Sequence, residues 1–144
     1  DADWHRVLDV DLNAVFYGCR AALPGMVSNN WGRIINLTGM NAIHGYSGRA
    51  PVSVAKHGVW GLTKALAKEF GPSGITVNAI SPGPIRPEHD DPIQSQHLHG
   101  QVGRIPLGHL GEPYHIASLC AYLISDGGGF VSGQMIACNG AAET

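Results

Sequence analysis

Three stretches of the chain place apolar residues at the spacing of an amphipathic helix. The first extends over 3–26, with Asp3 as the expected N-cap residue. The second covers 51–70, and the third covers 112–123 with Pro113 in its first turn, where proline is favoured. Each helix has one apolar face, so each is expected to pack against a common core.

Short apolar runs rich in branched residues alternate with these helices and are bounded by turn residues. They predict buried strands over 32–37, 75–80 and 133–137. Near-continuous apolar strands that alternate with helices are typical of a parallel sheet covered on both faces. The pattern therefore predicts a doubly wound α/β fold. Residues 85–105 lack periodicity and are expected to form a surface segment.

Composition narrows the range of functions and the cellular location. Charged residues make up only 14 % of the 144 residues, against about 25 % in average domains. This low share predicts surfaces that are covered, either by a partner subunit or by further chain. A net charge of −2 gives no electrostatic footprint for nucleic acid or an anionic membrane. The three cysteines have no CxxC spacing, which favours reduced thiols in a cytoplasmic protein. We expect neither a nucleic-acid partner nor a membrane partner.

Five sequence runs occur in an order that carries a family resemblance. They are WGRIINLTG (31–39), VSVAKHGVWGLTKALAKEF (52–70), GITVNAISPGPIRP (74–87), RIPLGHLGEP (104–113) and SGQMIACNG (132–140). Together they resemble the downstream half of the short-chain dehydrogenase/reductase family. The glycine-rich TGxxxGxG turn and the NNAG segment of that family are absent. We therefore interpret residues 1–144 as a single truncated, Rossmann-like domain, the C-terminal half of the fold.

The resemblance implies an oxidoreductase that uses NAD or NADP. Such proteins hold the pyrophosphate on a glycine-rich turn at a helix N-terminus, and this sequence has no such turn. We therefore expect that this chain alone binds no cofactor tightly. By resemblance, the positions left to contact a cofactor are Lys56, Pro82, Gly83 and Ile85.

The family's catalytic set is an asparagine, a serine, a tyrosine and a lysine. Lys56 stands at the lysine position, but Val52 lies four residues earlier where the tyrosine is expected. Gly39 stands at the serine position and Asp11 at the asparagine position, either as a base or as the ion-pair partner of Lys56. Valine cannot transfer a proton and glycine has no hydroxyl group, so the usual chemistry is expected to be disabled.

A second hypothesis is a hydrolase or lyase that uses the vacated pocket without a cofactor. Ser53 and Lys56 form an SxxK pair on one helical face, a spacing in which lysine can activate serine. His44 and Tyr46 lie in the loop that borders the pocket by resemblance, where they are candidate replacement acid/base groups. The simpler interpretation of all of these residues is structural or solvent-exposed polarity.

Histidines and aspartates gather in the aperiodic segment (His89, Asp90, Asp91, His97 and His99). An H-x-H motif with nearby carboxylates can bind zinc, but these residues lie at no fixed helical or strand spacing. We predict solvated loop residues there and no metal site.

The leading hypothesis is an oligomerising or partner-binding module that is inactive as a dehydrogenase. The resemblance implies a homo-oligomer, a dimer in the first instance, built through the helices at 3–26 and 51–70. The strand at 32–37 would also present an open edge, which favours pairing with another chain. A third hypothesis is that the sequence is a fragment of a longer NAD(P)-dependent oxidoreductase.

Overall fold

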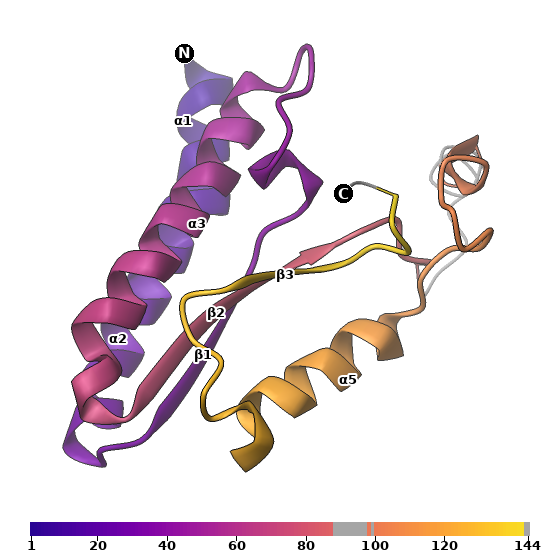
Figure 1. The fold of residues 1–144 in the computed structure, drawn as a ribbon. Coiled ribbons are helices and arrows are strands. Elements are labelled where there is room, and N and C mark those ends of the chain that lie inside the picture. The colour runs from indigo at the N-terminus through magenta and orange to yellow at the C-terminus, as the bar shows by residue number, and fades with distance from the viewer. Residues whose placement is uncertain (88–97, 99, 143–144) are drawn as a thin grey trace.

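The computed structural model describes residues 1–87, 98 and 100–142. Its three strands form one parallel sheet, and helices cover both faces of that sheet (Figure 1). The predicted doubly wound α/β class is confirmed.

The sheet places β2 (Ile75–Pro82) between β1 (Gly32–Leu37) and β3 (Met135–Cys138). Residues 75–81 of β2 are all buried, because the strand has a neighbour on each side and a helical layer on each face. The third strand was predicted to begin at Gly133 and in fact begins two residues later. Gly133 has a φ of 71°, a left-handed conformation that a strand does not continue.

The predicted first helix is a continuous helical segment from Ala2 to Ser28. It consists of α1 (Ala2–Leu8), one π-helical stretch (Asp9–Asn13) and α2 (Ala14–Ser28). The prediction of Asp3 as N-cap is wrong, because the helix begins at Ala2 and Asp3 lies in its first turn beside Arg6. Acidic residues favour both the cap and the first turn, so the sequence pattern did not separate the two positions.

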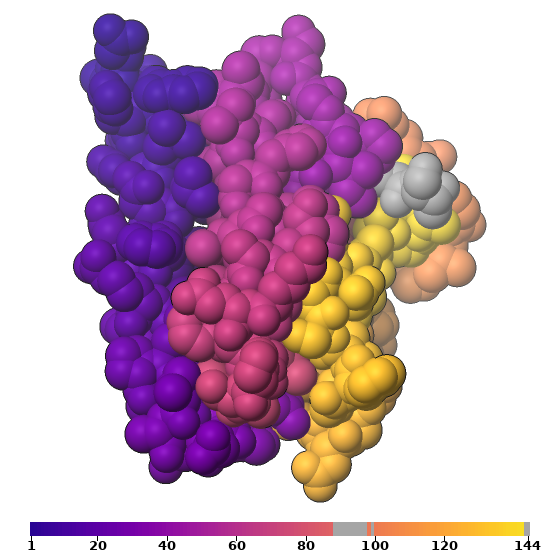
Figure 2. All heavy atoms as spheres, turned by 60° about the vertical axis from the view of Figure 1, so that its left-hand side comes forward, coloured from indigo at the N-terminus to yellow at the C-terminus, as the bar shows by residue number. Residues whose placement is uncertain are grey.

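Two further helices complete the layers. The helix α3 (Ala50–Phe70) lies beside α1 and α2 on one face of the sheet, and the two helical segments run side by side (Figure 2). The helix α5 (Pro113–Ile124) lies on the opposite face (Figure 1). Glu112 precedes it as N-cap in a capping box with His115, and Pro113 occupies its first turn as predicted.

The core lies between β1, β2 and the first helical layer. Its buried members are apolar side chains from α2, α3 and the sheet: Cys19, Leu23, Ile34, Leu66, Ile75 and Val77. This packing fixes the helices relative to the strands. It therefore also fixes the loops that leave the carboxyl ends of β1 and β2, where the candidate site lies.

A buried hydrogen-bond chain ties three elements of this core together. The Nδ2 of Asn36 in β1 donates to the Oγ1 of Thr63 in α3 at 2.9 Å, and that hydroxyl donates to the carbonyl of Val59 at 2.8 Å. The thiol of Cys19 in α2 donates to Asn36 Oδ1 at 3.7 Å. Burial raises the pKa of the Cys19 thiol.

The strand β1 is an edge strand of the described sheet, since β2 is its one neighbour there. A groove of about 400 Å³ runs between β1 and α2, and Leu37 at the end of the strand is 51 % exposed. β1 thus lies at one edge of the described sheet, beside this groove.

Candidate functional site

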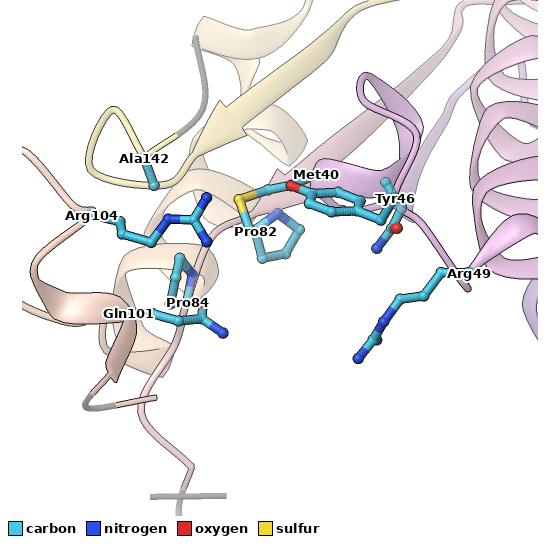
Figure 3. A pocket seen from close by; sticks show the side chains of 10 residues that line it. Met40, Tyr46, Arg49, Pro82, Pro84, Gln101, Arg104 and Ala142 are labelled. Atoms are coloured by element: carbon cyan, nitrogen blue, oxygen red, sulfur yellow. The ribbon is translucent and has the colours of Figure 1, made fainter. Parts of the chain in front are cut away.

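A cavity of about 390 Å³ lies at the carboxyl ends of β1 and β2 (Figure 3). The loop after β1 contributes one wall, and Pro82 and Pro84 at the end of β2 contribute another. Gln101, Arg104 and Ala142 close the remaining side. In open α/β sheets, ligands bind in crevices at this edge, so the cavity is the candidate site.

Gly39 begins the loop that forms the first wall. The preceding residue, Thr38, anchors the loop, because its amide and its hydroxyl both donate to the carbonyl of Ile80, at 2.9 and 3.0 Å. Gly39 then adopts φ 150° and ψ 173°, a conformation largely restricted to glycine. No heavy atom lies within 4 Å of the place where a Cβ would sit. The loop therefore leaves room for a side chain at residue 39 but holds the backbone in a glycine conformation.

Lys56 and Asp11 are brought together as an ion pair. The Lys56 Nζ lies 3.1 Å from Asp11 Oδ1, with the two side chains 19 % and 30 % exposed. Asp11 lies in the π-helical stretch, a rare local widening that often occurs at functional positions. Gly58 allows α3 to approach this stretch, because a Cβ there would lie 2.9 Å from Leu12 Cδ1. The charge of Lys56 is thus held by a carboxylate.

Val52 and Ser53 lie one turn before Lys56 on α3, and both are half-buried. The Ser53 Oγ is buried and has no hydrogen-bond partner among the described residues. The structure therefore does not join Ser53 to Lys56 in the hydrogen bond that an activated serine would need.

The two candidate acid/base residues of the loop are placed differently. Tyr46 lines the cavity together with Met40 (Figure 3). His44 is half-buried on the same loop but is not one of the residues that line the cavity. Of the two, the structure brings only Tyr46 into the candidate site.

The three residues at the end of β2 that were predicted to contact a cofactor do not all line the cavity. Pro82 lines the cavity, whereas Ile85 pairs with Gly111 and lines a second pocket on the other side of the segment. Gly83 lies against the chain's own backbone, because a Cβ there would lie 2.5 Å from Asn139 Cα. The close approach at Gly83 is therefore a contact between the ends of β2 and β3.

Sequence reasoning missed Arg49 and Arg104, two basic residues that line the cavity (Figure 3). Arg49 immediately precedes α3, and Arg104 lies in the segment before α5. The sequence shows only one arginine at the end of the loop after β1 and another arginine in the segment before α5. Without the fold, nothing in the sequence shows that these loops face one another.

The described residues form neither a metal cluster nor a membrane-spanning helix. Among these residues, no group of three or more histidine, cysteine, aspartate or glutamate side chains could hold a metal ion. The candidates His89, Asp90, Asp91, His97 and His99 lie outside the described residues. No helix in the described part of the chain is long and apolar enough to cross a membrane.

Comparison with known proteins identifies the family. A family profile described as "Enoyl-(Acyl carrier protein) reductase" matches residues 1–141. The chain belongs to the short-chain dehydrogenase/reductase family. It is 40 % identical over 139 residues to an acetoacetyl-CoA reductase of Cupriavidus necator, covering 96 % of this chain and 56 % of the relative. It is 39 % identical over 140 residues to a 3-oxoacyl-(acyl-carrier-protein) reductase of Rickettsia felis, covering 97 % and 58 %.

Solved structures agree with this assignment. A putative gluconate dehydrogenase from Agrobacterium tumefaciens superposes with a TM-score of 0.88 at 30 % identity, covering 98 % of this chain and 56 % of that protein. A putative oxidoreductase from Escherichia coli superposes with a TM-score of 0.85 at 32 % identity, with coverages of 98 % and 55 %. The chain thus spans little more than half the length of these family members.

Proposed function

We propose that this chain is a short-chain dehydrogenase/reductase module that binds ligands and partners but does not transfer hydride by the family's usual route. The observation that carries this proposal is the state of the former catalytic positions. Lys56 remains but is paired with Asp11, while valine and glycine occupy the positions of the tyrosine and the serine. No hydroxyl group is left at these positions to deliver a proton to a carbonyl oxygen.

Tyr46 does not restore the missing pair. Reduction of a carbonyl group needs a hydride at carbon and a proton at oxygen, and the family's usual donor is a phenol next to an ammonium. Tyr46 is a phenol within the cavity, but no lysine is among the residues that line it. The ammonium of Lys56 lies against a carboxylate from the first helical segment instead.

The cavity has room for only one end of a nicotinamide cofactor, and α5 offers no site for the pyrophosphate. A bound nicotinamide supplies or accepts the hydride, and the cavity beside Pro82 has space for a small ring. The pyrophosphate needs free amide groups at a helix N-terminus. The N-terminus of α5 is already satisfied by the capping box of Glu112 and His115, and Pro113 adds no donor. We therefore propose that the chain alone does not hold NAD or NADP tightly.

An exposed aromatic cluster on α2 supports the partner-binding part of the proposal. Phe16 and Tyr17 are 41 % and 53 % exposed although both are large and apolar. The Arg20 guanidinium lies 5.4 and 5.1 Å from the two ring centroids and joins them into one patch. Aromatic and arginine side chains are enriched at protein interfaces. We propose that the helices at 3–26 and 51–70 form a homo-oligomer through this layer.

The proposal is tested on the purified 144-residue chain by following oxidation of NADH and NADPH with a panel of ketones and aldehydes. We expect no carbonyl-dependent oxidation, and the same background rate from the Lys56→Ala and Tyr46→Phe variants. Carbonyl-dependent oxidation that either substitution abolishes would overturn the proposed loss of hydride transfer.

Sedimentation velocity tests the oligomer with the same preparations. We expect an assembly larger than a monomer that dissociates in Phe16→Asp, because a charge would then be buried in the interface. Phe130→Asp is the matched control, since Phe130 is fully exposed and outside this layer. A monomeric wild-type chain, or equal effects of the two substitutions, would contradict the proposed interface.

A further inference from the structure

We propose that the cavity at the ends of β1 and β2 is an oxyanion site, in which Arg49 and Arg104 hold the carboxylate or phosphate group of a small aliphatic ligand. This inference rests on the proposed function only in taking the cavity as the ligand site. It adds the chemical class of the ligand, which neither the family nor the missing catalytic groups specify.

The placement of the two arginines is the first observation. Arg49 comes from the end of the loop after β1, and Arg104 comes from the segment before α5. Their side chains approach the cavity from opposite sides and extend toward the space between them (Figure 3). Each guanidinium presents a planar set of N–H donors that matches the two oxygens of a carboxylate or phosphate.

The charge balance of the site is the second observation. The cavity is lined by two arginines and by no aspartate or glutamate. Among the described residues, neither Arg49 nor Arg104 has a carboxylate within ion-pair distance. Two other cations of the described residues do have such a partner: Arg86 lies 2.8 Å from Glu112, and Lys56 lies 3.1 Å from Asp11. The cavity therefore concentrates positive charge that no described side chain neutralises, and it favours an anion.

The size and the other walls of the cavity limit the ligand further. Its volume of about 390 Å³ is at the small end of the range for ligand sites, roughly 300–1,000 Å³. Met40, Pro82 and Pro84 supply apolar surface next to the arginines, and Gln101 adds an amide group. These walls fit a short carbon chain whose charged end lies between the guanidinium groups. A complete dinucleotide would exceed the cavity.

Isothermal calorimetry on the 144-residue chain tests the site with three probe ligands. They are 3-hydroxybutyrate, its uncharged methyl ester, and glycerol phosphate, which carries a phosphate in place of the carboxylate. We expect at least one of the two anions to bind at least tenfold more tightly than the ester, because charge-assisted hydrogen bonds to arginine are lost with the charge. Whichever anion binds more tightly identifies the oxyanion.

Matched substitutions assign the binding to the two arginines. Arg49→Gln and Arg104→Gln should each weaken anion binding by about tenfold and leave binding of the ester unchanged. Arg6→Gln removes the same charge from an exposed position on α1 and should have little effect. Arg→Lys at residues 49 and 104 retains the charge but loses the planar donor pair, and should recover only part of the affinity.

The outcomes are separate from those of the reductase assay. Equal binding of acid and ester, no binding of either anion, or equal effects of Arg49→Gln and Arg6→Gln would overturn the oxyanion site. Carbonyl-dependent oxidation of NADPH would instead overturn the proposed loss of hydride transfer. It would leave the calorimetric comparison of the three arginine variants intact.

Discussion

The backbone at Gly39 should disfavour any side chain, including that of a serine. Gly39 holds φ 150° and ψ 173°, in a region that residues with a Cβ rarely adopt. A Cβ built there meets no heavy atom within 4 Å. Substitution by alanine therefore introduces conformational strain without a steric clash, and the two effects do not have to be separated.

The magnitude follows from this geometry. Forcing a residue with a Cβ into such a conformation costs about 1–3 kcal/mol. This strain lies in the folded state, so Gly39→Ala should lower the free energy of unfolding by that amount. Replacing any glycine also restricts the unfolded chain, which stabilises the protein by about 0.4–1 kcal/mol. Gly45→Ala restricts the unfolded chain in the same way. Gly45 itself has open space for a Cβ and no positive φ, so this variant introduces no strain. The difference between the two variants thus isolates the strain.

Urea denaturation of the two alanine variants measures this difference. We expect Gly39→Ala to be less stable than Gly45→Ala by about 1–3 kcal/mol, with similar m-values because both unfold the same surface. Gly39→Ser should behave as Gly39→Ala does, since its hydroxyl adds no clash. If Gly39→Ala and Gly45→Ala have the same stability within error, residue 39 is not held in the glycine conformation and the reasoning fails.

Two further predictions concern the core. Leu123→Ala should lower the free energy of unfolding by about 2–5 kcal/mol because this side chain is 1 % exposed, whereas Leu107→Ala, 66 % exposed, should change it by less than about 0.5 kcal/mol in the same urea titration. Burial raises the pKa of Cys19 above 9.0, so the folded state binds the thiol proton more tightly than the unfolded state does. The stability that comes from the bound thiol proton is fully present below the pKa of the unfolded state. It is lost as the pH rises through the higher pKa of the folded state. Unfolding measured between about pH 8 and 10 should therefore show a steeper loss of stability for the wild type than for Cys19→Ala, and equal slopes would contradict it.

The sequence predicted the elements of the fold well because periodicity reports burial directly. The branched run over residues 32–37 is a six-residue strand in the structure, and the helix expected at 51–70 begins only one residue earlier. The errors lie at the ends of elements. Asp3 lies in a first turn rather than at a cap, and Gly133 turns the chain before the last strand begins. An aspartate fits either the cap or the first turn of a helix, and a glycine fits either the turn before a strand or its first residue. The sequence pattern alone therefore does not choose between the two positions.

The candidate site was predictable only where two residues share an element or a known motif. The spacing of Val52 and Lys56 on one helix is visible in the sequence, and so is the acidic residue Asp11. The facing arrangement of Arg49 and Arg104 is not, because it depends on how the loops after β1 and before α5 converge on the end of the sheet. Isolated charges in loops have no periodicity that would reveal such convergence.

Under the proposed loss of hydride transfer, the positions of Val52 and Gly39 are not equivalent. Val52 lies on a regular helix, where tyrosine is an ordinary residue, so replacement of this side chain alone leaves the backbone unchanged. Gly39 lies in a loop whose backbone conformation is closed to serine without strain. Asp11 in addition engages the ammonium of Lys56. If the proposal holds, a gain of the family's chemistry would need strain or a change of backbone at residue 39 and release of the Lys56–Asp11 ion pair, besides the two side-chain replacements. This is the physical reason why we propose a site that binds a ligand and does not transfer hydride.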